Sequence, residues 1–276
     1  MPASRQHISL RLRNVLDRLT GKEVALKGGM STSGVVRVGD TVRRPVKERS
    51  AFAHDVLRHL ELRGFDRAPR FLGIDEKGRA TFTYIAGTVR QQVGGLQKQQ
   101  WLAAARLLRL FHDATVDCEL RGECDVICHG DPGPGNYVLR DGMPFALIDF
   151  DGAHPGKREE DVGYAAWMWL HIGDRTVTPE VQGSHLVDFV AAYDPAATWS
   201  PLTAVLQAQK ATVARIPNGM KWANIGMWAQ ACMAWTWRHR EGIAAGMAKR
   251  SEVLSSLKGA VLPDSALQAP CEDARA

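Results

Sequence analysis

The most informative stretch of this sequence is Ile127-Cys-His129-Gly-Asp131-Pro-Gly-Pro-Gly-Asn136-Tyr-Val-Leu139, followed shortly by Ala146-Leu-Ile-Asp149-Phe-Asp151. Asp131 and Asn136 stand in a loop rich in Pro and Gly, which fix an irregular backbone. A short hairpin around Asp141-Gly142 is predicted to return the chain, so that Asp149 lies beside Asn136. Three converging oxygen-bearing side chains with no lysine among them suit a hard cation. Mg²⁺ bound together with nucleotide phosphates is the usual occupant of such a site.

The spacing His-x-Asp-x4-Asn with a downstream Asp is that of a kinase catalytic loop and its metal-binding segment. The sequence resembles the aminoglycoside phosphotransferase and choline kinase-like family, the small-molecule branch of the protein-kinase-like fold. His129-Gly-Asp131-x4-Asn136 matches the catalytic loop of that branch, with Gly130 where protein kinases usually have Arg. Ile148-Asp149-Phe-Asp151 matches its metal-binding segment. The resemblance extends over nearly the whole chain in element order, and either motif alone would be weak.

The resemblance implies a role for each matching residue. Asp131 would accept or orient the proton of the substrate hydroxyl that attacks the γ-phosphate. Asn136 and Asp149 would hold Mg²⁺ that bridges the phosphates. His129 would support the loop through hydrogen bonds without touching substrate. Asp151 would be either a metal contact or an anchor of the loop.

A further acid, Asp161, resembles the helix-start Asp that follows the metal-binding segment in this branch. We expect it to cap the helix and steady the loop. Taken one at a time, Asp131 and Asn136 also fit ordinary turn or cap residues, and Asp149 fits a turn former after a strand. Their order and spacing together favour the kinase interpretation.

The elements around these motifs predict an α+β, bilobal, protein-kinase-like fold. Residues 24–46 read as three short strands, 48–63 as a helix, and 71–85 as a hairpin, which makes a small sheet with one inserted helix. We therefore predict an N-lobe at 1–86 that binds nucleotide and a mainly helical C-lobe at 87–276.

The C-lobe is predicted to contain the catalytic loop and a helical acceptor-binding region. The catalytic loop spans 127–151, and the acceptor region spans about 159–260. Residues 101–112 form an amphipathic pattern, and almost everything after Glu159 is helix-compatible. The predicted helices of that region are 159–172, 180–193, 200–216, 220–246 and 249–260. The tryptophans of the segment 220–246 favour core packing over a ligand platform.

Two segments of the N-lobe are candidates for nucleotide contacts by resemblance. The loop Gly28–Gly34 occupies the place of the phosphate-covering loop, where Ser31, Thr32 and Ser33 and their backbone N–H groups could meet phosphate oxygens. An ordinary hairpin loop is the alternative. Tyr84, Ile85 and Ala86 would form the hinge whose backbone binds adenine, although a strand ending at a glycine predicts the same sequence.

The third strand departs from the family because it offers arginine where a lysine should meet the α- and β-phosphates. Val42 and Arg44 share one face of a period-2 strand, so Val42 would line the adenine pocket and Arg44 would meet the phosphates. Arg43 is the second candidate. Arginine can grip phosphate through two hydrogen bonds, so the change leaves function possible. The glutamate expected on the next helix is also uncertain: His54 falls near its position, with Glu48 and Asp55 as alternatives.

Charge and cysteine content limit the kinds of partner. Basic and acidic residues balance beyond Asp151, so the formal net charge of +5 belongs to residues 1–151, which suits a polyanionic ligand such as a nucleotide. No nucleic-acid partner, secretory signal or membrane span is expected. Five irregularly spaced cysteines predict a reduced, cytoplasmic protein without a disulfide framework. Cys124-x3-Cys128-His129 lacks a second ligand pair at zinc-site spacing, so no metal role is assigned to it.

The sequence therefore predicts a kinase that uses Mg²⁺ and ATP, with GTP as an open alternative, to phosphorylate a hydroxyl of a small molecule. Residues 180–240 contain three acidic and five basic residues, which favours a neutral or anionic acceptor over a polycationic aminoglycoside. A non-catalytic kinase-fold protein that binds a ligand or confers immunity to a toxin is the alternative, favoured by the missing strand lysine and helix glutamate. The acceptor, its physiological context (resistance, immunity or metabolism) and the oligomeric state stay open.

Overall fold

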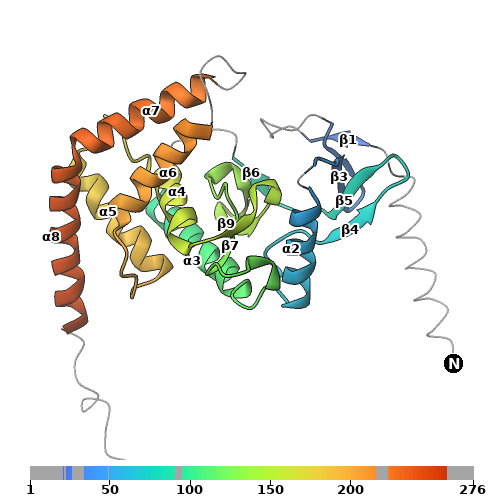
Figure 1. Ribbon diagram of the computed structural model, residues 1–276, viewed down its shortest axis with the longest axis horizontal. Helices are drawn as coiled ribbons and strands as arrows, with labels where there is room; N and C mark the ends of the chain where they lie inside the picture. The colour runs from blue at the N-terminus through green and yellow to red at the C-terminus, as the bar shows by residue number, and fades with distance from the viewer. Residues whose placement is uncertain are drawn as a thin grey trace, which may run out of the picture.

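The computed structural model describes residues 21, 23–26, 34–48, 50–90, 95–215 and 223–259. It confirms the predicted α+β, protein-kinase-like fold. A small antiparallel sheet with its helix lies on one side of the molecule, and a mostly helical remainder lies on the other (Figure 1). The predicted boundary between lobes at residue 86 stays a prediction.

The N-terminal sheet has five antiparallel strands in the order β1-β2-β3-β5-β4. The strands are β1 (Val24–Ala25), β2 (Val36–Val38), β3 (Thr41–Pro45), β4 (Phe71–Ile74) and β5 (Arg79–Thr83). Helix α2 (Ser50–Leu62) joins β3 to β4, as expected, and buries Ala53, Val56, Leu57 and Leu60 on one face. Strand β3 lies in the middle of this sheet, because it pairs with β2 on one side and with β5 on the other. In the second pair, Val42 lies opposite Phe82 and Arg44 opposite Ala80.

Two small sheets lie between the N-terminal sheet and the helices, and they carry the motif residues. The first pairs β7 (Val126–Cys128) with β10 (His154–Gly156). The second has β6 (Thr88–Val89), β8 (Tyr137–Arg140) and β9 (Met143–Leu147), in that order. The predicted hairpin at Asp141-Gly142 is present. Both turn residues have positive φ, 49° and 75°, as a type I′ turn requires.

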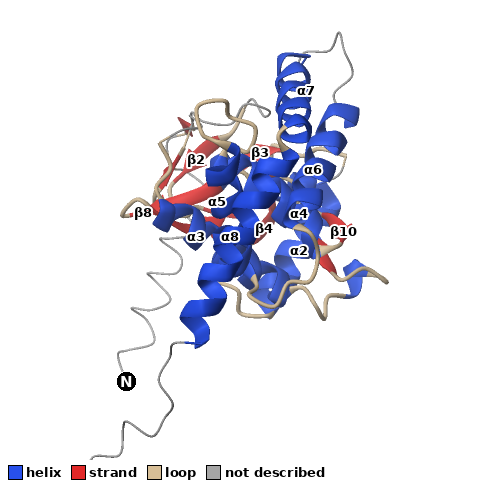
Figure 2. Cartoon of the chain, turned by 90° about the vertical axis from the view of Figure 1, so that its left-hand side faces the viewer, coloured by secondary structure: helices blue, strands red, loops and turns tan. Residues whose placement is uncertain are grey.

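The remaining helices pack around a core of large aromatic side chains. They are α3 (Lys98–Ala114), α4 (Arg158–Leu170), α5 (Pro179–Tyr193), α6 (Pro201–Arg215), α7 (Ala223–Arg238) and α8 (Arg240–Gly259), with 3₁₀ turns at Glu119–Arg121, Pro134–Asn136 and Phe150–Gly152. Figure 2 shows these helices from the end opposite the sheet. Helices α5 and α8 approach so closely at Gly183 that a Cβ there would lie 2.0 Å from the carbonyl oxygen of Ile243. No described helix is long and apolar enough to cross a membrane.

The structure corrects the predicted helices near the C-terminus. The single helix expected over 220–246 breaks at His239, where α7 ends and α8 turns away from it (Figure 1). The Nδ1 atom of His239 lies 2.9 Å from the carbonyl oxygen of Trp235, which also accepts the His239 backbone N–H. The side chain and the backbone N–H of His239 thus share one acceptor at the residue where the helix breaks.

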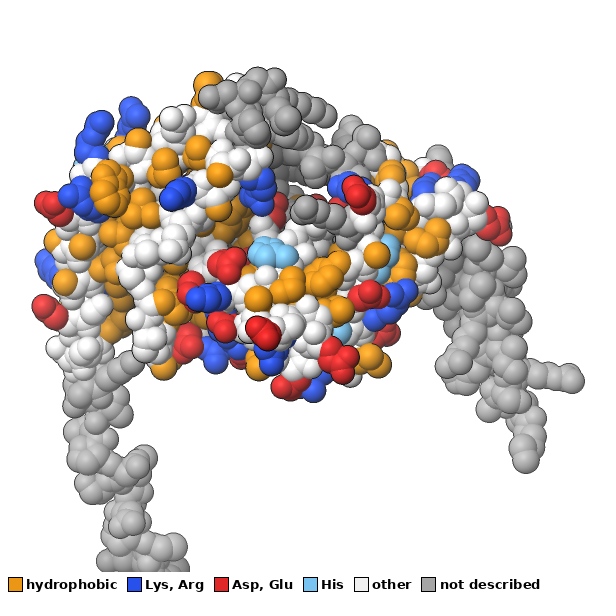
Figure 3. Space-filling model, viewed as in Figure 1, with side chains coloured by type: hydrophobic (Ala, Val, Ile, Leu, Met, Phe, Trp, Pro, Cys, Tyr) orange, Lys and Arg blue, Asp and Glu red, His pale blue; other side chains and the backbone are white. Residues whose placement is uncertain are grey.

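The expected core role of the α7 tryptophans is also corrected in part. Trp228 stacks on the buried Trp167, with ring centroids 4.9 Å apart, yet it is 43% exposed. Trp237 is 60% exposed. The space-filling view shows hydrophobic side chains gathered over this end of the molecule (Figure 3). Helix α7 therefore offers an apolar surface rather than a fully buried stripe.

Candidate active site

The predicted catalytic loop is held in place by one buried carboxylate. Asp161 is 2% exposed, and its two oxygens accept the backbone N–H groups of His129 at 2.6 Å and Gly130 at 2.9 Å. It also lies 3.1 Å from Nε2 of the buried His112. Burial alone would raise the pKa of Asp161, but these hydrogen bonds and the charges of His112 and His129 hold it below its ordinary value. The loop thus rests on an ionised carboxylate.

The structure places Asp161 next to the loop and past the N-cap position of α4. It steadies the loop, but it does not cap α4. The helix begins at Arg158, after the N-cap residue Lys157, whose backbone N–H donates to Oε1 of Glu160 at 2.8 Å. Asp161 is the fourth residue of the helix, four positions past the N-cap residue Lys157, so it cannot act as the cap.

The glycine after His129 lets two backbone segments touch. Gly130 has φ +79°, and a Cβ there would lie 2.2 Å from the carbonyl oxygen of Gly152. No other residue could occupy this place without moving the segment that carries Asp149 and Asp151. This contact gives a physical reason for glycine at the position where protein kinases have arginine. His129, fully buried, links the same two segments because its Nε2 lies 3.0 Å from the carbonyl oxygen of Ile148.

Asp131 carries its carboxylate at the centre of the site. The hydroxyl of Tyr164 and the amide of Asn136 both hydrogen-bond to it. Although the side chain reaches solvent, the surrounding protein desolvates it and raises its pKa; the charge of Asp149 adds to this shift, and both hydrogen bonds oppose it. A carboxylate with a raised pKa is a better proton acceptor than a free one.

Asn136 and Asp149 are brought together by the hairpin between them. The backbone N–H of Ile148 donates to the carbonyl oxygen of Asn136 at 2.9 Å, next to the pair Tyr137–Leu147. The amide Nδ2 of Asn136 donates to the carbonyl oxygen of Asp131 at 2.8 Å, which leaves its Oδ1 as a possible cation ligand. Asp149 has φ +65° and ψ +66°, a left-handed conformation that is uncommon outside glycine and clusters at functional sites.

Strand β3 reaches this segment through one of its two arginines. Nη1 of Arg44 lies 2.8 Å from Oδ1 of Asp149, and Nη2 of Arg44 contacts Asp151. Lys47 adds a second cation, with Nζ 2.8 Å from Oδ2 of Asp151. Arg43 instead lies on the other face of the sheet, where it pairs with Asp75 at 3.5 Å. Of the two arginines, the geometry places Arg44 where a strand cation could meet phosphates.

Helix α2 carries a histidine where a glutamate was expected. His54 is 6% exposed and stacks on Phe71, with ring centroids 3.8 Å apart. Burial and the charge of Arg44 lower the pKa of His54, which keeps it neutral beside that guanidinium. Asp55, one of the alternatives, pairs with Arg58 on the surface. Arg44 is therefore held by Asp149 and Asp151 of the predicted metal-binding segment.

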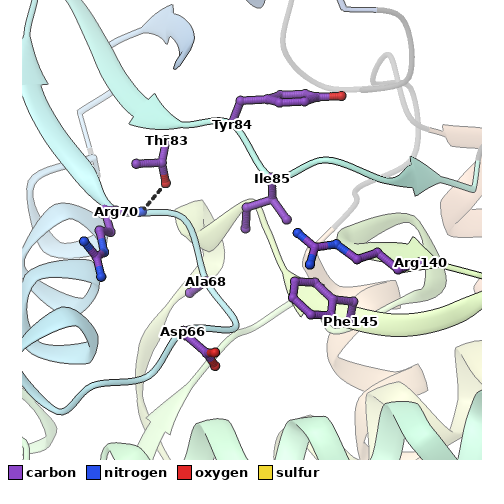
Figure 4. Close-up of a pocket in the computed structure, with 8 residues that line it drawn as sticks. All are labelled: Asp66, Ala68, Arg70, Thr83, Tyr84, Ile85, Arg140 and Phe145. Carbon is purple, nitrogen blue, oxygen red and sulfur yellow. Dashed lines mark hydrogen bonds between the residues drawn. The ribbon is translucent and has the colours of Figure 1, made fainter. Parts of the chain in front are cut away.

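The hinge residues lie beside a pocket of about 260 Å³ (Figure 4). Tyr84 and Ile85 line it together with Thr83. The other lining residues come from the segment before β4 and from the β8–β9 hairpin: Asp66, Ala68, Arg70, Arg140 and Phe145. The backbone N–H of Tyr84 donates to the carbonyl oxygen of Asp40, and the carbonyl oxygen of Ala86 accepts from Nε of Arg140. Adenine binding by the hinge stays a prediction.

Of the other predicted nucleotide contacts, the structure describes Val42 but not the loop residues. Val42 is half-buried on the face of β3 that it shares with Arg44. Ser31, Thr32 and Ser33 lie outside the described residues. Sequence reasoning missed Tyr164, a residue in the first half of α4 that no motif marks, and Lys47, which lies just after β3.

The fold and the two motifs match those of phosphotransferases with the protein-kinase-like fold. The model of the phosphotransferase enzyme family matches residues 123–202, the stretch that contains both motifs. The resemblance inferred from those motifs is thereby confirmed. The chain is also 28% identical to the trifolitoxin immunity protein of Rhizobium leguminosarum bv. trifolii, over 82% of this chain and 99% of that protein.

Two solved structures share the fold at low sequence identity. The apoenzyme of the macrolide 2'-phosphotransferase MphH from Brachybacterium faecium superposes with a TM-score of 0.53 at 16% identity, covering 87% of this chain and 96% of that one. The ADP-bound aminoglycoside phosphotransferase APH(2'')-Ib superposes with a TM-score of 0.52 at 14% identity, covering 84% and 98%. At these identities the similarity shows a shared fold and nothing more.

Proposed function

We propose that this protein transfers the γ-phosphate of ATP, or of GTP, to a hydroxyl group of a small molecule. The observation that carries the proposal is the meeting of Asp131, Asn136 and Asp149, three residues that a single hairpin and a shared hydrogen-bond network bring to one place. Phosphoryl transfer asks mainly for positioning and charge neutralisation, which this set supplies. The ADP-bound structure of a protein with the same fold supports a nucleotide co-substrate.

In this mechanism Asp131 accepts the proton of the acceptor hydroxyl. The hydroxyl oxygen forms a bond to the γ-phosphorus, the bond from that phosphorus to the β–γ bridging oxygen breaks, and the nucleoside diphosphate leaves. Tyr164 and Asn136 hold the Asp131 carboxylate in position. Asp161 and His129 hold the loop that carries it.

Asn136 and Asp149 fit Mg²⁺, because the ion takes a few protein oxygens together with phosphate oxygens. Bound there, Mg²⁺ would neutralise the charge on the phosphates. Asp151 is engaged by Arg44 and Lys47, which favours its role as an anchor of the segment over that of a metal ligand. The guanidinium of Arg44 would bind the nucleotide phosphates when these displace Asp149 from it.

The acceptor is proposed to be neutral or anionic. Two of the three acids of residues 180–240 are paired elsewhere: Asp188 with Lys98 and Arg250, and Asp194 with Arg109. The third, Glu180, is exposed in the first turn of α5, with Oε1 beside Gly242 of α8. Arg215, by contrast, is close enough to act on the pKa of Tyr164, which itself touches Asp131. A polycation would find few free carboxylates on this side of the site.

A thermal-shift experiment tests the nucleotide and metal site. Wild type, Asp149→Asn and the surface control Asp117→Asn are melted with ATP or GTP, each with and without Mg²⁺. Asparagine is chosen because it tolerates the left-handed backbone of residue 149. A ligand at 100 times its Kd adds about 2.7 kcal/mol of stability. We expect a Mg²⁺-dependent rise in wild type and Asp117→Asn and none in Asp149→Asn.

Turnover is then tested by release of the nucleoside diphosphate across a panel of neutral and anionic hydroxyl compounds, with aminoglycosides and macrolides included. Asp131→Asn should abolish turnover while nucleotide still raises the melting temperature. Turnover by Asp131→Asn equal to wild type would overturn the assignment of the base.

A second candidate function is a binding protein that confers immunity to a peptide toxin without catalysis. The relative named as a trifolitoxin immunity protein and the exposed tryptophans of α7 favour it. No stabilisation by any nucleotide at millimolar concentration, in the presence of Mg²⁺, would favour this candidate over the kinase.

A further inference from the structure

A cluster of three potential metal ligands lies behind the catalytic loop, outside the set already assigned. Cys128 ends β7, His154 begins β10, and Glu160 stands in the first turn of α4. One ligand atom from each side chain lies within 4.8 Å of the other two. Cys128 has no partner pair at zinc-finger spacing in the sequence, but the fold brings it next to ligands from other elements.

The strand register places two of these ligands on one face. Cys128 and His154 are direct partners in the antiparallel pair of β7 and β10, so their side chains leave the same side of the ribbon. Glu160 reaches back over the same end because its Oε1 accepts from the Lys157 backbone N–H at 2.8 Å. Its other oxygen, Oε2, lies 3.6 Å from Nε2 of His154.

The hydrogen bond of His154 prepares its second nitrogen for a metal. Nδ1 lies 2.9 Å from the carbonyl oxygen of Gly152, which can only accept, so Nδ1 carries the hydrogen. A neutral ring then presents a lone pair at Nε2. Metal-ligating histidines almost always have their other nitrogen fixed in this way, by a carboxylate, a carbonyl group or water.

A glycine keeps the space between the other two ligands open. A Cβ on Gly156 would lie 2.8 Å from Sγ of Cys128 and 3.2 Å from Oε1 of Glu160. His154 and Glu160 are each about half exposed, 46% and 50%, so an ion could enter between them, while Cys128 forms the buried floor.

We propose that Cys128, His154 and Glu160 bind a Zn²⁺ ion. A thiolate, an imidazole and a carboxylate are the ligands that Zn²⁺ takes in tetrahedral sites, with water in the fourth position. On binding, the ion replaces the thiol proton that Cys128 now donates to the carbonyl oxygen of Lys157, and that proton leaves to solvent. Mg²⁺ prefers oxygen ligands alone and would not compete.

A neighbouring group that shares Cys128 is the weaker candidate. His112 and Asp161 also lie within reach of that thiol. Both are buried, however, and their atoms are already engaged with each other, with Tyr193 and with the catalytic loop. A metal bound there would have to break the hydrogen bonds by which Asp161 holds the loop that carries Asp131.

The position of the proposed site gives it a structural role. Strand β7 leads directly into the catalytic loop, β10 follows the metal-binding segment, and α4 supplies Asp161 beneath both. An ion bound to one residue from each would fasten the three elements together at the back of the active site. This inference does not depend on the proposed transfer reaction.

The test uses the full chain, stripped of metal with a chelator and kept reduced. Zn²⁺ affinity and stoichiometry are measured by competition with a chromophoric chelator, and Co²⁺ is added in parallel because a cobalt–thiolate bond gives a charge-transfer absorption. We expect one Zn²⁺ per chain, the cobalt–thiolate band, and a melting temperature raised by Zn²⁺ but not by an equal concentration of Mg²⁺.

Two variants and one control separate this site from adventitious binding. Cys128→Ser should lose the cobalt–thiolate band, and His154→Ala, at a half-exposed position, should lose the tight Zn²⁺ binding. Cys118→Ser, at a buried cysteine outside the cluster, should keep both, and a circular-dichroism melt checks that each variant folds. Zn²⁺ binding that is absent in wild type, or unchanged in Cys128→Ser and His154→Ala, would overturn the proposal and leave His154 and Glu160 as a simple side-chain contact.

Discussion

The guanidinium of Arg44 closes on the carboxylate of Asp149, with Nη1 2.8 Å from Oδ1. The side chain of Arg44 is 12% exposed and that of Asp149 is 34% exposed, so the pair is partly shielded from water. It joins the N-terminal sheet directly to the segment proposed to hold Mg²⁺. The guanidinium of Arg44 and a bound Mg²⁺ would compete for the Asp149 carboxylate. Binding of nucleotide and metal must therefore displace the contact between Arg44 and Asp149.

Removing this cation should weaken nucleotide binding. Arg44→Ala deletes a charge-assisted contact of about 1.5–3 kcal/mol, which corresponds to a roughly 10- to 100-fold higher Kd for MgATP. Arg44→Lys should restore part of the affinity, because lysine keeps the charge but not the forked geometry. Isothermal titration measures the effect, with Arg58→Ala, which removes an exposed surface pair, as the control. An unchanged Kd in Arg44→Ala would exclude a phosphate contact by Arg44.

Loss of the Tyr164 hydroxyl should slow turnover and shift its pH dependence. The hydrogen bond from Tyr164 lowers the pKa of Asp131 against a larger upward shift from desolvation. In Tyr164→Phe the pKa of Asp131 should rise further, so the acid limb of the kcat/KM profile should move to higher pH. A lost hydrogen bond of about 1.4 kcal/mol would lower kcat about tenfold. The profile is measured with the acceptor found in the screen, and an unmoved acid limb would contradict the contact.

Substituting Gly130 should destabilise the protein more than its backbone torsion alone requires. Gly130→Ala meets both a positive φ and the Gly152 carbonyl oxygen 2.2 Å from the new Cβ. Gly142 has nearly the same φ, +75°, but a Cβ there meets nothing within 4 Å. We expect Gly142→Ala to cost about 1–2 kcal/mol, and Gly130→Ala to cost more than that in urea denaturation. Equal losses would mean that the loop yields freely at Gly130.

The stability of the protein should fall with acidification, in part because of His54. Its pKa is lowered in the folded state by burial and by the charge of Arg44. The unfolded chain therefore binds more protons, and the free energy of unfolding falls as the pH drops below about 6.5, by at most about 1.4 kcal/mol per pH unit for one histidine.

The variant His54→Phe isolates this contribution. Phenylalanine keeps a flat ring on Phe71 and removes the buried Nε2 of His54, for which the described residues supply no hydrogen-bond partner. Urea denaturation at pH 5, 6, 7 and 8 should show a shallower decline in the variant and a constant difference from wild type between pH 7 and 8. Parallel curves over the whole range would rule out a role for His54 in the acid sensitivity.

Local patterns were sufficient to predict the elements that hold the motifs, while contacts between distant segments were not readable from the sequence. The Asp141-Gly142 turn and the spacing of Asp131 and Asn136 are local, and each predicted a feature that the structure contains. The pairing of Arg44 with Asp149 joins residues far apart in the chain, so it depends on how the sheet meets the hairpin. Tyr164 lies on a helix whose register, not its composition, aims the hydroxyl at Asp131.

A line of aromatic contacts leads away from the site. Tyr164, which touches Asp131, packs edge to face against Trp167, with ring centroids 5.9 Å apart. Trp167 in turn stacks on Trp228 of α7. Indole emission responds to ring contact and to water, and Trp228 is exposed to water on one side. The protein thus carries an optical reporter of its own, which should change its emission when an acceptor displaces water beside Tyr164 or when α7 shifts.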